Sequence, residues 1–411
     1  MNEYARVTVR LDETVVAGRN PRADSRQDTH EHIPGSVLRG ALAAVWIQRH
    51  GTGITTTPEF TRIFEGEGGF GPLHCPASLP VPLSMRTHKY PHTNRCRQLW
   101  WDEARYETAD FCPTADCASP LETGKGEPRG TVRTVDRTMN AMSPDGVTLD
   151  GGLYSQRALP DELRLTGWVH GDALRALYPD DTPVTELLLG SRRSLRGHAT
   201  VEIDTETVPD PVECHGNEVI LRLASPGVFV DEYGMPTDQP DREELSEVLG
   251  VRIQEITGSW PRWEETGGWH AASGLPKPVE RVVSAGSTYR LRCEQPPTEQ
   301  ARRLLMTRGI GLRRREGFGG LYRIDPPVGI AELTSRIAPL TRSSRLLSLF
   351  RYRLDPLRNG TGDDTRFHNA LRRDDIEEDI ATAIRTLLDV EDPALYEQLL
   401  DFLDNLLENK R

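Results

Sequence analysis

Apolar and polar side chains alternate at the start of the chain, where Ala5, Val7, Val9 and Leu11 share one side of residues 4–11. A period of two residues is typical of a strand with one buried face. Residues 199–203 and 218–223 are apolar and β-branched enough to be strands as well. The pattern thus predicts sheet structure in both halves of the chain.

A helical period follows the first strand. Val37, Leu38, Ala41, Leu42 and Val45 form an apolar stripe, Ser36 precedes it as a possible N-cap, and Gly51 can end it. We predict a helix over residues 36–50. Its first turn would offer backbone N–H groups and the positive end of the helix dipole to a phosphate, with Arg39 one turn further on.

A long hairpin arm is predicted over residues 131–168. Strand-like segments at 131–136 and 163–169 flank the turn signal Pro144-Asp-Gly146. A short helix is expected at 241–249, and strands again within 279–293. Short strands interspersed with few helices predict the α+β class.

The C-terminal segment reads as helical and acidic. From residue 374 onward, apolar residues recur at helical spacing and give two amphipathic helices broken at Pro393. The segment 374–411 holds twelve acidic residues against three basic ones, a net charge of −9 out of −12, so the other 373 residues carry only −3. Because nucleic acid responds to local potential, a nearly neutral body with basic loops is compatible with RNA binding.

Composition excludes an integral membrane protein. Apolar residues make up 36% and charged residues 27%, and no apolar run is long enough to cross a bilayer. The N-terminus has no apolar signal core, so we expect a cytoplasmic protein whose cysteines are thiols or metal ligands.

Cysteine and histidine gather in an insertion predicted over residues 58–125, which is rich in Pro and Gly. Cys112 and Cys117 form a knuckle slightly longer than CxxC, and His88 with Cys96 would complete a tetrahedral zinc site. A small insertion with little core needs such a staple, although buried thiols are the alternative. Further candidate ligands in this stretch are His74, Cys75 and His92.

Two loops combine glycine with arginine, a composition that suits a backbone cradle for phosphates. The strongest is 309–320, where five glycines surround three consecutive arginines; a second spans 190–198. Neither has the ending of an NTPase phosphate loop or a dinucleotide fingerprint. With the helix start, these loops supply the predicted RNA-binding residues: Gly35, Ser36, Arg39, Arg192, Arg193, Arg196, Gly309, Gly311, Arg313, Arg314, Arg315, Gly317, Phe318 and Gly319.

Each Gly/Arg loop closes one half of the chain in this division, which indicates an internal duplication. We therefore divide the sequence into residues 1–205, containing the insertion and the arm, residues 206–330, ending in the Gly-rich loop, and residues 331–411, a linker with the acidic helices.

Ile33-Pro-Gly-Ser-Val-Leu-Arg-Gly-Ala-Leu42 resembles the signature of the RAMP superfamily of CRISPR RNA-binding subunits, and 309–320 resembles its Gly-rich loop. The order of strand, helix, Cys/His insertion, arm, Gly/Arg loop, Gly-Gly-Trp segment and final loop resembles the large subunit of type III-D complexes, which has two RRM-like domains. In departure from that pattern, the first loop ends Leu-Arg-Gly-His, and His88 stands in place of a cysteine.

The resemblance implies two ferredoxin-like (RRM-like) domains and a non-catalytic subunit that caps the repeat-derived 5′ handle of the crRNA. Its partners would be the crRNA, target RNA in the assembled complex, the backbone RAMP subunits and the large polymerase-like CRISPR subunit. The cofactor expected from the Cys/His insertion itself is a structural zinc ion.

Three alternatives stay open. In backbone-type relatives an acidic residue before the signature helix cleaves target RNA with a divalent metal, and Asp24 or Asp28 occupies that loop here. A guide-processing endoribonuclease would use histidine, for which His30, His32 and His198 are the candidates. A plain scaffold without RNA contact is the third.

Overall fold

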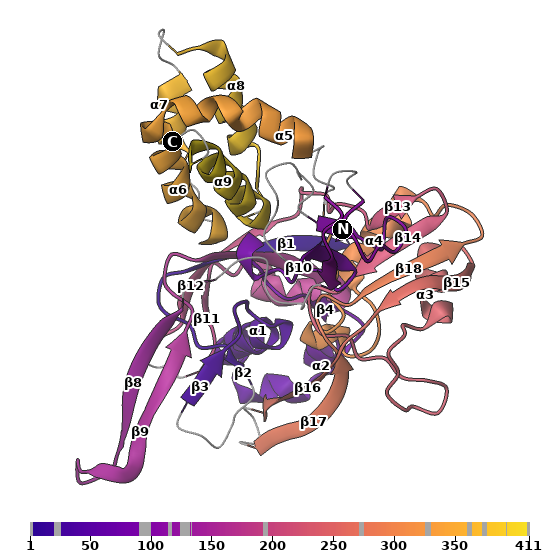
Figure 1. Ribbon diagram of the computed structural model, residues 1–411. Helices are drawn as coiled ribbons and strands as arrows, with labels where there is room; N and C mark the ends of the chain where they lie inside the picture. The colour runs from indigo at the N-terminus through magenta and orange to yellow at the C-terminus, as the bar shows by residue number, and fades with distance from the viewer. Residues whose placement is uncertain are drawn as a thin grey trace. The chain divides into compact units, whose positions relative to one another are not determined.

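The computed structural model describes residues 3–19, 26–89, 100–113, 117–123, 132, 134–191, 196–270, 275–324, 330–359, 364–371, 376–391 and 393–408. The chain divides into two compact units (Figure 1). The first comprises residues 1–75 and 132–323, and the second comprises residues 76–131 and 324–411.

The first sheet of the first unit has the strand order β11-β12-β1-β10-β4. Its strands are β1 (Tyr4–Leu11), β4 (Gly69–Phe70), β10 (Arg164–His170), β11 (Glu186–Leu188) and β12 (His198–Asp204). β1 pairs antiparallel with β10 and β12, and β10 pairs antiparallel with β4. With β1, β4, β10 and β12 numbered in chain order, this is the 4-1-3-2 arrangement of a ferredoxin-like sheet, with β11 added at the edge.

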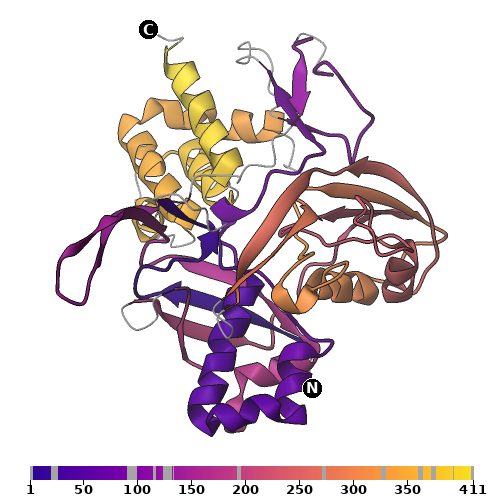
Figure 2. The ribbon, with the colours of Figure 1, turned by 90° about the horizontal axis from the view of Figure 1, so that it is seen from below.

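One face of this sheet is covered by α1 (Gly35–His50), α2 (Pro58–Glu65) and the 3₁₀ segment η3 (Gly171–Leu177), as Figure 2 shows. The alternation of β1 buries Val7 and Val9 completely toward that face. α1 buries Leu38, Leu42 and Trp46, and the indole Nε1 of Trp46 donates to the carbonyl of Ala176 in η3, 3.2 Å away. The predicted helix and its apolar stripe therefore form.

The second sheet has the order β13-β14-β18-β15. Its strands are β13 (Glu213–His215), β14 (Glu218–Arg222), β15 (Ile253–Trp260) and β18 (Thr288–Cys293), and its helices are α3 (Arg242–Leu249) and α4 (Glu299–Arg308). α3 joins β14 to β15, so three of the four ferredoxin positions are filled in the usual order. The fourth position is taken by β13, which precedes β14 as a hairpin partner.

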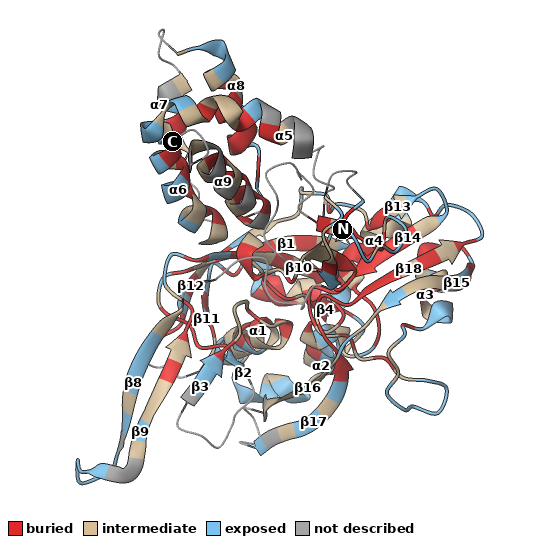
Figure 3. Cartoon of the chain, viewed as in Figure 1, coloured by how far each residue is buried: buried red, intermediate tan, exposed pale blue. Residues whose placement is uncertain are grey.

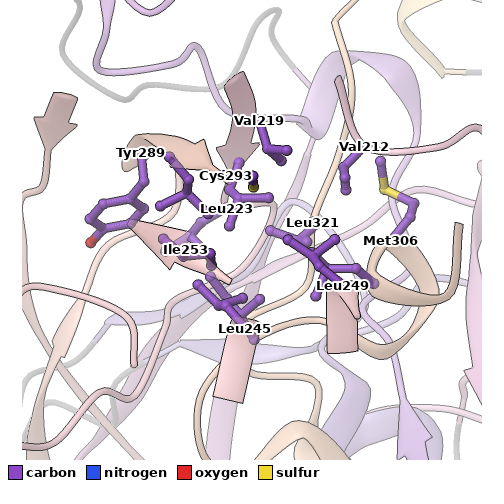
Figure 4. Packing of buried hydrophobic residues seen from close by; sticks show 14 of the residues in the cluster. Val212, Val219, Leu223, Leu245, Leu249, Ile253, Tyr289, Cys293, Met306 and Leu321 are labelled. Atoms are coloured by element: carbon purple, nitrogen blue, oxygen red, sulfur yellow. The ribbon is translucent and has the colours of Figure 1, made fainter. Parts of the chain in front are cut away.

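The core of this half gathers side chains from both helices and the sheet. Leu221, Tyr289 and Leu291 from the strands are buried in one cluster with Leu245 and Leu305 from the helices. Figure 4 shows Tyr289 and Leu245 of this cluster. Tyr289 also donates its hydroxyl to the carbonyl of Asp238, 2.6 Å away. The predicted α+β class with ferredoxin-like folds is confirmed.

Two hairpins extend the first unit. β8 (Val135–Met142) and β9 (Thr148–Ala158) turn at Pro144-Asp-Gly146 as expected, and with β2 (Gly18–Arg19) and β3 (Arg26–Thr29) they form the sheet β2-β3-β9-β8. The arm is largely exposed (Figure 3). The expected second strand of the arm, 163–169, instead belongs to the first sheet as β10. The other hairpin pairs β16 (Trp263–His270) with β17 (Leu275–Val283).

The predicted insertion also begins later than expected. Residues 58–75, expected to be irregular, contain α2 and β4 and complete the first ferredoxin-like domain. The side chain of Thr57 caps α2 by accepting from the amide of Phe60, and Pro58 stands at the first helical position, which is a favourable helix start.

The second unit contains the sheet β6-β5-β7 and a group of helices. The strands are β5 (Met85–His88), β6 (Trp100–Asp102) and β7 (Leu121–Thr123); the helices are α5 (Ile330–Ile337), α6 (Ser344–Asn359), α7 (Thr365–Leu371), α8 (Glu378–Leu388) and α9 (Pro393–Glu408). α8 and α9 are the two predicted acidic helices. The stretch from 331 to 373, expected as a linker, carries α5, α6 and α7.

Short 3₁₀ turns complete the chain at η1 (Thr52–Thr56), η2 (Pro76–Ser78), η4 (Pro179–Asp181), η5 (Arg314–Glu316) and η6 (Ala338–Arg342). Over the described ranges, no helix combines the length and the apolar character required to cross a membrane.

Candidate nucleic-acid interface

Two glycines from the two ferredoxin-like halves touch through their backbones. A Cβ atom added to Gly35, at the start of α1, would lie 2.6 Å from the Cα of Gly317 and 1.9 Å from the carbonyl oxygen of Phe70. A Cβ added to Gly317 would lie 2.7 Å from the Cα of Gly35. The Gly-rich loop therefore crosses the start of α1 at a distance that only glycine allows.

The start of α1 differs by two residues from the predicted cap. Pro34, in an extended conformation, is the N-cap, and its carbonyl accepts from the amides of Val37 and Leu38 at 2.9 and 3.2 Å. Ser36 lies inside the first turn, and no side chain caps this end. Proline suits this position because its fixed φ continues directly into the helix.

The Gly-rich loop is folded tightly on its own backbone. Gly309, Gly311, Gly317 and Gly319 all have positive φ, and Cβ atoms on Gly309 and Gly311 would lie 2.6 Å from the carbonyl oxygens of Gly319 and Val228. The amides of Gly309 and Gly319 donate to Leu305 and Pro226. These glycines thus serve the packing of the loop, and these two amides already have protein acceptors.

Arg313 is locked by carboxylates. It has a positive φ of 58°, and its guanidinium donates through Nε and Nη2 to both oxygens of Glu316, at 3.0 and 2.8 Å. Nη1 reaches Glu280 of β17 at 2.5 Å, and the guanidinium carbon lies 4.5 Å from the ring centre of Phe318. A bidentate pair with a stacked ring holds the side chain in one orientation.

The carboxyl of Glu316 is strongly acidic in this setting. Burial raises its pKa, but hydrogen bonds from Arg313 and Lys277 outweigh burial and lower it to about 2. The ammonium of Lys277 lies 2.6 Å from this carboxylate. Glu316 is therefore ionised throughout the physiological range.

Arg314 points into the second half. It donates to Glu244 of α3 and, over 2.7 Å, to the carbonyl of Gly311, and Arg308 lies 3.7 Å from the same Glu244. His170 is close to both arginines: burial first, and then the charges of Arg314 and Arg308, lower its pKa to about 4. Only 18% of the Arg314 side chain is exposed, so Arg314 fixes the loop more than it presents charge to solvent.

Arg315 is the most accessible of the three, with 43% of its side chain exposed. Its Nη1 donates to the carbonyl of Glu65, 2.8 Å away, and its Nε lies 3.5 Å from the Glu65 carboxylate. Arg39 of α1 donates to that same carboxylate and, over 2.8 Å, to the carbonyl of Phe64. We call Arg39, Glu65 and Arg315 the arginine pair cluster; two guanidiniums share one carboxylate there, which leaves one net positive charge.

The other predicted Gly/Arg loop behaves differently. Arg192 and Arg193 lie outside the described residues. Arg196 is buried and donates to the side-chain carbonyl of Gln156. The side-chain NH₂ of Gln156 in turn donates to the side-chain oxygen of Gln27 over 2.8 Å. Arg196 thus supports the base of the hairpin arm.

The structure describes all but one of the residues considered as candidates for RNA cleavage. Asp24 lies outside the described residues, and Asp28 on β3 has its carboxylate 3.6 Å from Arg157. Burial first, and then the charges of Arg19 and His74, lower the pKa of His30 to about 4. His32 stacks on His74 with ring centres 4.4 Å apart, and burial lowers its pKa well below the usual value. Both rings are therefore neutral at pH 7, while His198 is exposed.

Three of the four predicted zinc ligands converge. The ligand atoms of His88, Cys112 and Cys117 all lie within 4.8 Å of one another. Cys96 and His92 lie outside the described residues, and His74 and Cys75 belong to the first unit, whereas the group belongs to the second.

Sequence reasoning missed the acidic partners of the Gly-rich loop. Glu65, Glu244 and Glu280 come from α2, α3 and β17, which are far apart in sequence, and no local pattern distinguishes them from other surface glutamates. Only Glu316, three residues after Arg313, carried a local signal, since such spacing in a single turn favours an ion pair.

Comparison with known proteins agrees with the motifs. Residues 134–325 match the family model of the CRISPR-associated protein Cas_Cmr3. Over this range, which is less than half of the chain, the protein is similar to a CRISPR-associated family, as the motifs predict. The matched range includes the hairpin arm, the second ferredoxin-like half and the Gly-rich loop, and it starts after α1. No curated protein matches the chain.

Solved structures similar to the chain include a subunit of the type III-B Cmr-beta complex bound to cognate target RNA and AMPPnP, at 11% identity, with 69% of this chain and 86% of that chain covered and a TM-score of 0.39. A RAMP protein binding different RNA substrates matches at 12% identity, covering 78% and 99%, with a TM-score of 0.32. The Csm3-Csm4 subcomplex of a type III-A complex matches at 9%, covering 78% and 100%, also with 0.32.

Proposed function

We propose that this chain is an RNA-binding subunit of a type III CRISPR effector complex and that it holds the repeat-derived 5′ handle of the crRNA. The observation that carries the proposal is the arginine pair cluster beside the Gly35 and Gly317 contact, within a chain that matches a CRISPR-associated family. The cluster lies where the α1 start and the Gly-rich loop meet.

The arginine pair cluster suits a phosphate because Arg39 and Arg315 already converge on an anionic group. The Glu65 carboxylate occupies a position between two guanidiniums that a phosphate oxygen would also favour, since both anions accept forked N–H donors. An RNA backbone at this point would either join the cluster, attracted by its net positive charge, or displace the carboxylate. Arg313 and Arg314, held by Glu316, Glu280 and Glu244, keep the loop in the shape that presents Arg315.

The finer assignment follows the resemblance. In this proposal the complex is of type III-D, the subunit is non-catalytic, and it nucleates assembly with the backbone RAMP subunits and the large polymerase-like subunit. Target RNA is met only in the assembled complex. The arm β8–β9 exposes Met142, Val147 and Leu153, which suits a wedge between splayed bases of a single strand.

Substitutions at Glu65 and Arg315 of the cluster test the proposal. Glu65→Gln in the full-length chain removes the carboxylate between the two arginines, so binding of a handle RNA should tighten a few-fold and depend more steeply on salt. Arg315→Ala should weaken binding on the order of tenfold at low salt and lower the slope of log K against log salt by about 0.7. Fluorescence anisotropy with a repeat-derived RNA, at salt concentrations of roughly 50 to 300 mM, measures the affinity and its salt dependence.

Glu299→Gln is the matched control, because Glu299 pairs with Arg303 on the exposed side of α4 and its loss changes net charge equally. The proposal predicts no more than a small uniform change for that variant. Equal effects of Glu65→Gln and Glu299→Gln, or unchanged binding in Arg315→Ala, would remove the cluster as the RNA contact.

A further inference from the structure

The sheet β6-β5-β7 brings residues from separate parts of the sequence to one point. β5 pairs antiparallel with β7, and in that register His88 lies opposite Leu121. The amide of Lys89 donates to the carbonyl of Pro120 over 3.0 Å, which continues the pairing beyond His88. This pairing fixes the position of His88 next to the segment that leads into β7.

That loop carries two cysteines. The amide of Cys112 donates to Ser119 over 2.8 Å, and the amide of Leu121 donates to Asp110 over 2.9 Å. These bonds hold residues 110–112 beside residues 119–121, with Cys112 on the first segment and Cys117 just before the second. Ala118 has a positive φ of 45°, an unfavourable value for a residue with a Cβ, so a specific constraint holds the chain at this turn.

The donor atoms have the spacing of metal ligands. Sγ of Cys117 lies 3.3 Å from Nε2 of His88, and all three donor atoms lie within 4.8 Å of one another. Two ligands of a tetrahedral zinc ion stand about 3.6–3.8 Å apart, given bonds of about 2.3 Å to sulfur and about 2.0–2.1 Å to nitrogen. The donor atoms depart from that spacing by at most about 1 Å, so small side-chain rotations would place the three of them around one ion.

From this geometry we propose that His88, Cys112 and Cys117 bind a structural zinc ion. Two thiolates and a neutral imidazole form a soft donor set that selects zinc over magnesium or calcium. Binding releases the two thiol protons, and the two thiolate charges balance the charge of the ion. The fourth position is completed by water or by one further donor.

The small core around Cys112 and Leu121 is the part of the protein that the ion would stabilise. Cys112 and Leu121 are the buried members of a separate small core, against which Trp101, Ala109 and Cys117 pack. A core of this size contributes little, and modules of this kind are usually stabilised by a metal or a disulfide. The zinc would therefore hold Cys112 and Cys117 against His88 of β5.

The test uses the full-length chain purified without added metal. Mass spectrometry of the metals should find about one zinc per chain, and Cys112→Ser, Cys117→Ser and His88→Ala should each lose most of it. Cys214→Ser is the control: this half-buried thiol donates to the carbonyl of Gly216 in the other unit, and its loss should leave the zinc content unchanged. Zinc content that is equally low in all proteins, or equal in the control and the three ligand variants, overturns the proposal.

A second measurement covers variants that fail to fold. The unaltered chain is stripped with a chelator, titrated with Co²⁺ and followed by absorption, and then probed by limited proteolysis within 100–123. Thiolate-to-cobalt charge transfer and cobalt-dependent protection of this segment are expected. Absence of the charge-transfer band in folded protein contradicts thiolate ligation. The inference is independent of the proposed RNA binding, so either can fail alone.

Discussion

Gly35 and Gly317 meet backbone to backbone, one at the start of α1 and the other in the Gly-rich loop after α4. This contact gives a structural reason for the glycine in both RAMP-like motifs. It also brings Arg39 and Arg315 to the same carboxylate, Glu65, so the packing of two halves builds the candidate interface.

The first prediction concerns this contact. Gly35→Ala would place a Cβ 1.9 Å from the carbonyl oxygen of Phe70. Because the backbone must move to relieve this clash, the free energy of unfolding should fall by about 1–3 kcal/mol or more. Gly40→Ala is the matched control, because nothing lies within 4 Å of its Cβ position on the same helix. That variant should gain about 0.5–1 kcal/mol from helix propensity. Urea unfolding followed by circular dichroism measures both; equal destabilisation would contradict the contact.

The second prediction concerns pH. The pKa of Glu316 is lowered to about 2 from an ordinary value of 4.5, so its ion pairs with Arg313 and Lys277 stabilise the fold above pH 4.5. That stability is lost as pH falls from 4.5 toward 2. Glu316→Gln should therefore be less stable than the unaltered chain at pH 6, with the gap narrowing toward pH 3. Urea midpoints across this range measure it, and a constant gap would show that Glu316 acts without its charge.

The third prediction concerns the helices of the second unit. Arg353 is buried, forms a bidentate pair with Asp364 at 2.7 and 3.0 Å, and donates to the carbonyls of Leu387, Leu388 and Val390 at the end of α8. Lysine cannot reproduce this fork, so Arg353→Lys should cost about 1–3 kcal/mol. Arg351→Lys, at an exposed pair with Asp404, should cost little. Similar thermal unfolding of the two variants would contradict the capping role.

Local patterns predicted the elements that local physics determines. The alternation of Val7 and Val9 predicted β1, and the helix expected at 241–249 forms as α3. Asp241 caps it by accepting from the amides of Glu243 and Glu244. Two further helices begin at a threonine whose side chain accepts from an amide in the first turn. Thr57 accepts from Phe60 in α2, and Thr298 accepts from Ala301 in α4. Short helices among Pro and Gly are easily missed in a sequence. The strand at 164–170 was assigned to the arm because its partner, β1, lies far away in sequence.

The candidate site was predictable as composition but not as geometry. Gly and Arg in one loop indicate an anion site, yet Arg313 and Arg314 turned out to bind Glu280 and Glu244, which other elements supply. Arg315 became the accessible cation only because α2 ends beside it at Glu65. Contacts between distant elements decide which arginine is presented, and a single sequence does not reveal them.

The most direct test of the central claim is to express the chain with its genomic neighbours and a repeat array, isolate the complex through this subunit, crosslink it, and sequence the bound RNA. Crosslinks concentrated on a shared repeat-derived 5′ tag, and mapping to Arg39, Arg315 or their neighbours, are the result we predict. Crosslinks spread along the variable spacer, with none on the tag, would contradict the proposed role.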